Sequence, residues 1–271
     1  SEFGKYLVVF IMMAITIGFV SGFLVADGSM LRAYDDSFQK YNIEDGYFQT
    51  KKKLTPAQKE DIEKSDVKVY ENFYIEQKLT NGSTIRFFKN RKEVDKVCLM
   101  NGKMPKKSGE IAVDRMYADN NELKVGDTVK SRKKTFRITG LVALSDYSAL
   151  FQNNNDTMFD AVKFGVAIVT DKDFEALNQV KVQYNYAWIY DKKPATEKKE
   201  KKMAEDLMED MADVVTIESF VPQYQNQSIH FTGDDMGSDR AMIVMLLYIV
   251  MAILAFVFGI TISNTIRKEA G

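Results

Sequence analysis

The sequence predicts an α+β domain, residues 27–240, between two transmembrane α-helices, residues 1–26 and 241–266. Residues 6–26 and 241–266 contain no charged residue. At about 1.5 Å per residue, either run is long enough to cross a hydrocarbon core of about 30 Å. Between the two runs, short segments with strand and helix periodicity alternate, which predicts a folded domain with a crossover α/β portion and a small β-rich portion.

Basic residues orient the two spans. Lys5 precedes the first span, and Arg267 and Lys268 follow the second, so the positive-inside rule places both outer ends in the cytoplasm. Residues 27–240 are therefore predicted to be extracytoplasmic, in a multi-pass protein of the cell membrane. A cleavable signal peptide is the alternative for the first run, but that run exceeds the roughly 7–15 apolar residues expected of one.

Charge and cysteine content restrict the classes of function. The chain has 37 basic and 38 acidic residues, so it lacks the basic excess that is typical of proteins that bind nucleic acid. Its single cysteine, Cys98, excludes an internal disulfide. The domain must therefore be held together by its hydrophobic core.

Helix signals open the domain. Apolar residues recur at helical spacing over residues 29–41, which predicts that the first span continues outward as a helical stalk. Thr55 and Pro56 are suited to the N-cap and first position of a second helix over residues 57–64.

Strand signals follow. Residues 67–79 are rich in Val, Tyr, Phe and Ile and are predicted to form a hairpin with residues 84–88 through the turn Asn81-Gly82. Further strands are predicted at residues 110–113, 128–130, 135–142, 166–170 and 186–190. Short helices are predicted after Val113 and over residues 171–177, the second with an Asp cap.

The clearest helix of the domain is predicted over residues 196–212, where one face is apolar. It lies between the strand at 186–190 and a strand predicted at 214–220. This order predicts a crossover unit with the helix packed on a sheet. Residues 146–163 and 223–239 are polar and without periodicity, so both are predicted to be mobile loops.

Catalytic residues, metal ligands and cofactors are not predicted. His230 is the single histidine, which excludes a histidine-based zinc site, and it is predicted to be a surface residue of a loop. Asp234, Asp235 and Asp239 offer oxygen ligands to calcium, but their spacing does not match the EF-hand pattern. The favoured interpretation is a lead-in to the second span, with Ser238 or Asp239 at its N-cap.

Small residues line one face of each span at four-residue spacing. They are Ala14, Gly18, Gly22 and Ala26 in the first span, and Ala255, Gly259 and Ser263 in the second. Such ladders let another helix approach closely. The spans are therefore predicted to pack within a helix bundle.

Four short segments follow one another in the β-rich portion. They are Gly102-Lys103-Met104-Pro105, Gly109-Glu110-Ile111, Leu123-Lys124-Val125-Gly126-Asp127 and Phe136-Arg137-Ile138-Thr139-Gly140. In this order they resemble the Gly-Arg-x-Pro, Gly-Glu-Ile, Leu-x-Val-Gly-Asp and Phe-x-Val-x-Gly segments of the extracytoplasmic domain of FtsX/MacB-type ABC transporter permeases. Lys103 stands where that family often has Arg.

A fifth segment, residues 264–271, is similar to the family's Arg-x-x-Glu-Ile-Gly segment, with Ala270 where Ile is usual. In the family this segment begins the cytoplasmic connection toward the ATPase. The resemblance therefore implies that Arg267, Lys268 and Glu269 couple the chain to an ATPase.

The resemblance implies a permease subunit that transmits motion from a cytoplasmic ABC ATPase to its extracytoplasmic domain. ATP hydrolysis would belong to that separate partner, since no glycine-rich phosphate loop occurs in the sequence. The resemblance also implies two further partners, a second permease copy or half and the lipid bilayer, as well as further membrane spans. It does not identify the substrate or protein partner outside the cell.

A two-span sensor, such as a chemoreceptor or a histidine kinase, is the alternative. Its outer domain would bind a small molecule and signal through the second helix. A helical signalling linker after residue 271 would indicate the sensor, and further membrane spans would indicate the permease.

Overall fold

The computed structural model describes residues 2–131 and 134–269. It divides into a helical unit, drawn from Ser1–Asp36 and Thr232–Gly271, and a domain, Ser37–Phe231. The predicted fold class is confirmed, because a mixed α/β sheet domain is flanked by two helices that are long and apolar enough to cross a membrane.

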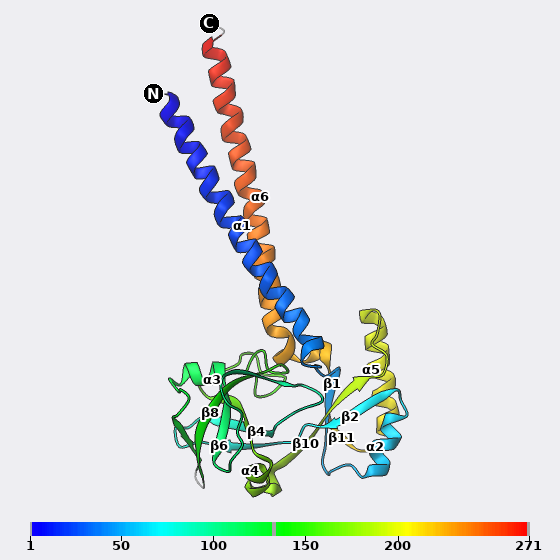
Figure 1. The fold of residues 1–271 in the computed structure, drawn as a ribbon. Coiled ribbons are helices and arrows are strands. Elements are labelled where there is room, and N and C mark those ends of the chain that lie inside the picture. Colours follow the sequence, from blue (N-terminus) through cyan, green and yellow to red (C-terminus); the bar gives the residue numbers. More distant parts are fainter. Residues whose placement is uncertain (1, 132–133, 270–271) are drawn as a thin grey trace. The chain divides into compact units, whose positions relative to one another are not determined.

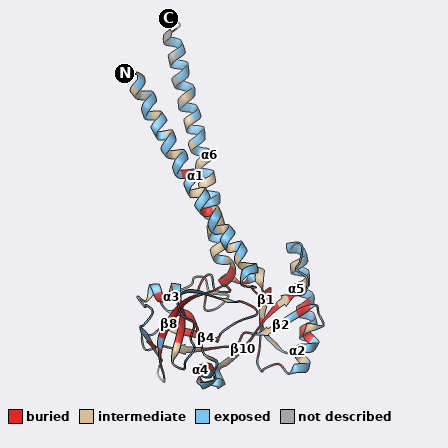
Figure 2. Cartoon of the chain, viewed as in Figure 1, coloured by how far each residue is buried: buried red, intermediate tan, exposed pale blue. Residues whose placement is uncertain are grey.

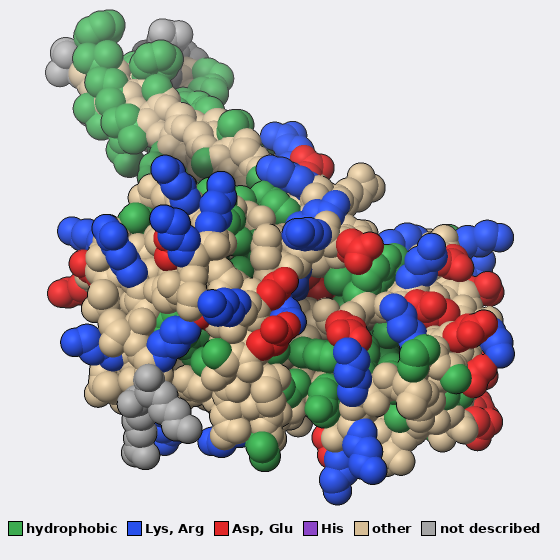
Figure 3. Space-filling view, turned by 60° about the horizontal axis from the view of Figure 1, so that its bottom comes forward, with side chains coloured by type: hydrophobic (Ala, Val, Ile, Leu, Met, Phe, Trp, Pro, Cys, Tyr) green, Lys and Arg blue, Asp and Glu red, His purple; other side chains and the backbone are tan. Residues whose placement is uncertain are grey.

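The helical unit is formed by most of α1 (Glu2–Lys40) and most of α6 (Gln227–Glu269), whereas residues 37–40 and 227–231 of these helices belong to the domain. Gly233 packs against the ring of Tyr34, since a Cβ at this glycine would lie 2.5 Å from a ring carbon. The apolar parts of both helices are almost wholly exposed (Figure 2), with Phe19 at 72% and Phe256 at 71%. In Figure 3, hydrophobic side chains cover the helical segments, whereas basic and acidic side chains are interspersed on the domain.

The helix signals at the start of the domain are confirmed. Helix α1 continues without a break to Lys40. Helix α2 (Pro56–Glu63) begins with a capping box, in which the Thr55 hydroxyl accepts from the Gln58 N–H and the Gln58 side chain accepts from the Thr55 N–H.

The described residues of the domain form 11 strands in one sheet, in the order β11-β1-β10-β3-β4-β9-β6-β8-β5, with β2 on β10 and β7 on β8. The strands are β1 (Gly46–Thr50), β2 (Val67–Glu71), β3 (Tyr74–Lys78), β4 (Thr84–Lys89), β5 (Val97–Gly102), β6 (Glu110–Asp114), β7 (Thr128–Lys130), β8 (Thr135–Leu144), β9 (Phe164–Val169), β10 (Val182–Tyr190) and β11 (Ile217–Pro222). The other helices are α3 (Arg115–Asn120), α4 (Asp171–Ala176), α5 (Glu197–Ala212) and the 3₁₀ helices η1 (Gln179–Lys181) and η2 (Gln223–Gln225).

Two lobes share this sheet, each with its own hydrophobic core. Lobe A contains β1, β2, β11, α2 and α5, and its core includes Phe48, Trp188 and Met211. Lobe B contains β3 to β9, α3 and α4, and its core includes Phe87 and Phe136. Strand β10 belongs to both lobes, because its start pairs with β3 and its remainder with β1 and β2.

The predicted crossover is confirmed in lobe A. Strand β1 is antiparallel to both β10 and β11, so β10 and β11 are parallel, and α5 connects them. Helix α5 buries Ala204, Leu207 and Met211. The apolar face predicted from the sequence is therefore the face that packs on the sheet.

Several predicted elements need correction. Residues 67–79 form two strands, because the chain passes from lobe A to lobe B at Asn72. Strands β1 and β5 were not predicted, since one is short and the other has mostly exposed side chains. The N-cap of α4 is Thr170, whose hydroxyl accepts from the Asp173 N–H, and not an Asp.

The prediction of a loop over residues 223–239 is wrong, because α6 begins at Gln227. Ser238 and Asp239 therefore lie inside a helix and cap nothing. The first turns of α6 are held by tertiary contacts that composition does not reveal, such as the ring of Phe231 against Phe151 at 5.4 Å between centroids.

The capping box of α2 gives a test of local stability. Replacing Thr55 by Ala leaves the Gln58 N–H without its side-chain acceptor, so the free energy of unfolding should fall by about 1 kcal/mol. Denaturant unfolding of the chain in detergent micelles measures this change. Thr80→Ala is the matched control, because Thr80 is exposed in a turn, and an equal loss in both variants would contradict the assignment.

Candidate functional site

A polar cavity of about 380 Å³ lies between the two lobes. Its wall in lobe A comes from β1, β10 and β11, and its wall in lobe B comes from β3, β4 and the loop over residues 145–156. Most lining side chains are amides or aromatic rings. A cavity of this size falls in the range of small-molecule sites.

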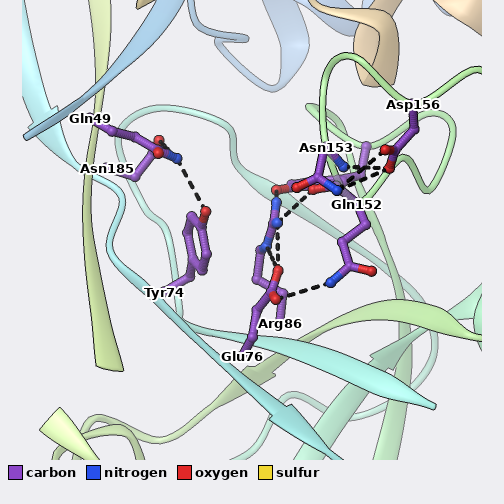
Figure 4. Close-up of polar contacts among 9 residues, drawn as sticks. Gln49, Tyr74, Glu76, Arg86, Gln152, Asn153, Asp156 and Asn185 are labelled. Carbon is purple, nitrogen blue, oxygen red and sulfur yellow. Dashed lines mark hydrogen bonds and ion pairs between the residues drawn. The ribbon is translucent and has the colours of Figure 1, made fainter. Parts of the chain in front are cut away.

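Arg86 of β4 lies in the lobe B wall, and each of its three guanidinium nitrogens donates a hydrogen bond to a neighbour (Figure 4). Its Nε and Nη2 donate to Glu76 Oε1 at 3.0 and 2.6 Å, and Nη1 donates to the Tyr147 hydroxyl at 2.5 Å. Nη2 also donates to the Gln152 carbonyl at 2.7 Å. The guanidinium lies over the ring of Tyr74, 4.1 Å from its centroid.

Hydrogen bonds join the two lobes across the cavity. The Gln49 amide of β1 donates to the Tyr74 hydroxyl of β3 at 3.1 Å and to Asn185 Oδ1 of β10 at 3.2 Å. On the lobe B side, the Gln152 amide donates to Glu76 Oε2 at 3.1 Å, which holds the 145–156 loop to β3.

A buried acidic cluster lies at one end of the cavity. Arg91 makes a bidentate ion pair with Asp146 at 2.6 and 2.7 Å, and its Nη1 lies 4.0 Å from Asp95 Oδ2. Asp95 also accepts from the Glu44 N–H at 2.8 Å and from Asn72 Nδ2 at 3.3 Å. Asp95 and Asp146 therefore share the Arg91 guanidinium, and the carboxyl of Glu44 lies beside that of Asp95.

This arrangement shifts the proton affinities of the cluster. Burial, and then the charges of Asp95 and Asp146, raise the pKa of Glu44 well above its usual range. Burial and the charge of Asp146 raise the pKa of Asp95 to about 7, although Arg91 acts in the opposite direction. At neutral pH the cluster therefore retains protons that exposed carboxylates would lose.

Two junction segments, residues 41–45 after α1 and residues 223–231 at the start of α6, also border the cavity. In the first, the Asp45 N–H donates to the Trp188 carbonyl of lobe A at 2.8 Å, and the Asn42 amide donates to the Glu93 carbonyl at 2.8 Å. In the second, the Ala149 N–H donates to the Ser228 carbonyl at 3.0 Å.

The junction segments also bind each other. The Gln223 N–H donates to the Asp45 carbonyl at 2.8 Å, and Asn226 Nδ2 donates to Glu44 Oε1 at 3.3 Å. Both ends of the domain are thus attached at one place, beside the cavity. Sequence analysis did not find this site, because its residues are scattered along the chain and only the polar run Asn153-Asn154-Asn155 marks it.

His230 belongs to the second junction segment. The prediction of a surface loop residue is wrong, because His230 lies in α6, is half-buried, and has its ring centroid 6.2 Å from that of Phe38. Among residues 2–131 and 134–269, no group of three or more His, Cys, Asp or Glu side chains is arranged to hold a metal ion. Asp234, Asp235 and Asp239 instead lie along α6.

The small-residue ladders are exposed in the helical unit. Ala14, Gly18, Gly22 and Ala26 of α1 and Ala255 and Gly259 of α6 are all exposed. A Cβ added at Gly18, Gly22 or Gly259 meets nothing within 4 Å. The ladders do not meet each other, so their packing against further helices stays a prediction.

Helix α6 carries the predicted coupling residues. It extends to Glu269, and Arg267 is exposed near its end. The side chains of Lys268 and Glu269 lie outside what the structure describes, as does Ala270. The coupling role of Arg267, Lys268 and Glu269 stays a prediction.

The segments that resemble a permease domain come together around β8 in lobe B. Strands β5 and β7 pair antiparallel with β8, and β6 pairs parallel with it. Gly140 in β8 is needed for close approach, since a Cβ there would lie 2.6 Å from the Lys103 carbonyl oxygen. Gly126 lies in a turn before β7 with φ +106°, a backbone conformation that glycine adopts without steric cost.

Comparisons with known proteins find similarity among solved structures. No family model and no curated protein matches the chain. The extracellular domain of the noncanonic ABC-type transporter YknZ from Gram-positive bacteria is similar with 12% identity and a TM-score of 0.33, over 64% of this chain and 98% of that one. The periplasmic region of MacB from Actinobacillus actinomycetemcomitans is similar with 13% identity and a TM-score of 0.33, over 64% of this chain and 87% of that one.

The acidic cluster predicts a pH-dependent stability. An unfolded Asp has a pKa of about 3.9, so the folded chain binds the Asp95 proton more tightly, and the free energy of unfolding falls as pH rises from about 4 to about 7. Asp95→Asn removes one such group and should make this fall smaller by about 1–3 kcal/mol, since each unit of pKa difference corresponds to about 1.4 kcal/mol.

Thermal and denaturant unfolding of the detergent-solubilised chain across this pH range measures the difference. Asp191→Asn is the matched control, because Asp191 is exposed. Identical pH dependence in the parent chain and in Asp95→Asn would show that Asp95 does not hold its proton in the folded state.

Proposed function

We propose that the chain belongs to a permease subunit of an FtsX/MacB-type ABC transporter and transmits motion from the membrane to its extracytoplasmic domain. The work is driven by a separate cytoplasmic ABC ATPase, and the chain itself is not an enzyme. The four segments around β8 and the two apolar helices support the permease assignment. Both helices lie in the cell membrane, which leaves the domain outside the cytoplasm.

The observation that carries the transmission proposal is the continuity of the two helices. Helix α1 spans 39 residues and α6 spans 43, each from its apolar run to a junction segment. No proline interrupts either helix. Without a proline kink, each helix would pass a displacement of its membrane part along its length to the junction segment.

The junction segments would deliver this displacement to both lobes. The first contacts lobe A through the Trp188 carbonyl and lobe B through the Glu93 carbonyl, and the second contacts the lobe B loop through the Ala149 N–H. Movement of the two helices relative to each other would therefore act on bonds to both lobes and change the width of the cavity. The exposed ladders on α1 and α6 would receive further spans, from the same subunit or from a second permease copy.

A two-span sensor remains the second candidate, and the cavity favours it, because a sensor needs an outer site for a small molecule. The two candidates differ in their partners. Only the permease needs an ATPase, and only the permease needs ATP to move its outer domain.

A proline in α1 tests transmission. In the complete protein, reconstituted in liposomes with the ATPase that co-purifies with it, spin labels at Lys106 of lobe B and Lys198 of lobe A should change their separation when ATP is added. Both sites are exposed. Ala33→Pro should abolish this change without preventing ATPase binding, because proline breaks the helix between the membrane and the domain.

Ala33→Ser is the matched control, because it keeps the helix and should behave as the parent. Distances are measured by pulsed electron paramagnetic resonance in a Cys98→Ser background. Failure of any ATPase to co-purify, or an ATP-dependent change that survives Ala33→Pro, would contradict the proposal.

A further inference from the structure

We propose that the cavity between the lobes binds a small organic cation, with a primary ammonium group that donates a hydrogen bond to Glu44. This inference concerns the domain alone. It holds or fails independently of the proposed permease function.

Glu44 presents a carboxylate oxygen without a donor. The residue is 2% exposed and lines the cavity. Its Oε1 accepts from Asn226 and its carboxyl lies beside that of Asp95, but no described residue donates a hydrogen bond to its Oε2. Because a buried carboxylate oxygen without a donor is strongly unfavourable, this atom needs either a proton or a donor from a ligand.

The charges around the cavity select a cation. Among the described residues that line it, Glu44, Asp146 and Arg86 are the charged ones. Asp146 is neutralised by Arg91, and Arg86 by Glu76. Glu44 has no cation paired with it, so the wall becomes negative when this carboxyl releases its proton, and a cationic ligand would balance that charge.

An anionic ligand is poorly suited to this wall. Arg86 already uses its guanidinium for Glu76, the Tyr147 hydroxyl and the Gln152 carbonyl. No lysine is among the described lining residues. An anion would therefore meet Glu44 without a cation to balance it.

The uncharged part of the wall suits an ammonium ion on a short carbon chain. The aromatic side chains of Tyr47 and Phe220 line the cavity, where they can contact a cation and methylene groups. The amides of Asn153 and Asn185 offer donors and acceptors to a second polar group.

The cavity is open to a ligand from solvent. Some residues that line it are exposed to solvent, namely Asn153, Asn155 and Gln225. Two others, Glu44 and Asn226, are buried. A ligand that enters past the exposed amides would reach Glu44 with its charged end. Its volume is limited by the cavity of about 380 Å³, which fits a small molecule and not a folded partner.

Binding would be linked to protons and to the junction segments. In the empty cavity, burial and the nearby Asp95 and Asp146 raise the pKa of Glu44, while Arg91 opposes the shift, so this carboxyl keeps its proton to a higher pH than an exposed one. An ammonium ligand favours the carboxylate, so binding releases a proton. Glu44 and Asn226 belong to different junction segments. The ligand would therefore bind at the place where the two segments are joined.

Isothermal titration of the full chain in detergent micelles tests the proposal with putrescine as the probe. The expected Kd is about 10 µM to 1 mM, as is usual for a small ligand with one charged contact. Butane-1,4-diol, the uncharged isostere, should not bind. Glu44→Gln should weaken putrescine binding by about 10- to 100-fold, because it removes the charge and leaves the hydrogen bond from Asn226 in place.

Glu60→Gln on the exposed surface of α2 is the matched control and should bind as the parent. Circular dichroism confirms that Glu44→Gln is folded. If that variant fails to fold, two measurements on the parent chain test the proposal. Its affinity for putrescine should rise with pH, and titrations in buffers of different ionisation enthalpy should reveal a proton released on binding.

Three results would overturn the proposal. They are the absence of saturable putrescine binding to the parent, equal binding of putrescine and butane-1,4-diol, and binding that neither Glu44→Gln nor pH alters. Binding of Ca²⁺ or K⁺ that displaces putrescine at a lower concentration would show a site for an inorganic cation and would also overturn it.

Discussion

The hydrogen-bonded attachment of the two junction segments is the constraint on which the rest of the structure depends. Residues 41–45 and 223–231 carry backbone groups that are buried near the boundary of the lobes, and such groups need partners. The Asp45 N–H finds the Trp188 carbonyl, and the Gln223 N–H finds the Asp45 carbonyl. These bonds fix both ends of the domain at one place, and the cavity forms beside them.

The proposed function depends on the width of the cavity, which the attachment of the junction segments does not fix. The lobes are connected through β10, through the chain between β2 and β3, and through side-chain bonds such as that from Gln49 to the Tyr74 hydroxyl. The cavity between them is polar, so it can hold water or a ligand when its width changes. Helices that end in the junction segments would act on this cavity first, and an occupant that binds Glu44 would act in turn on the junction segments.

Patterns among neighbours in sequence predicted most helices and strands, whereas the cavity is formed by contacts between residues far apart in the sequence. The Thr55 capping box and the crossover helix over residues 196–212 depend on neighbours in sequence, and the structure confirms them. The start of α6 depends on Phe151 and on Asn154, which the sequence places far away. Glu44 and Asp95 form a pair with no pattern of spacing, so no periodicity could reveal the acidic cluster.

Hydrogen exchange tests the central claim most directly, because it reports whether the junction segments belong to the cooperative core. Exchange of the full chain in lipid nanodiscs is followed by mass spectrometry for peptides that cover residues 41–45 and 223–231. The account predicts protection equal to that of β10, which lies in the centre of the sheet. Exchange as fast as that of the exposed residues 51–53 would show that the helices are joined to the domain by mobile linkers, and would contradict it.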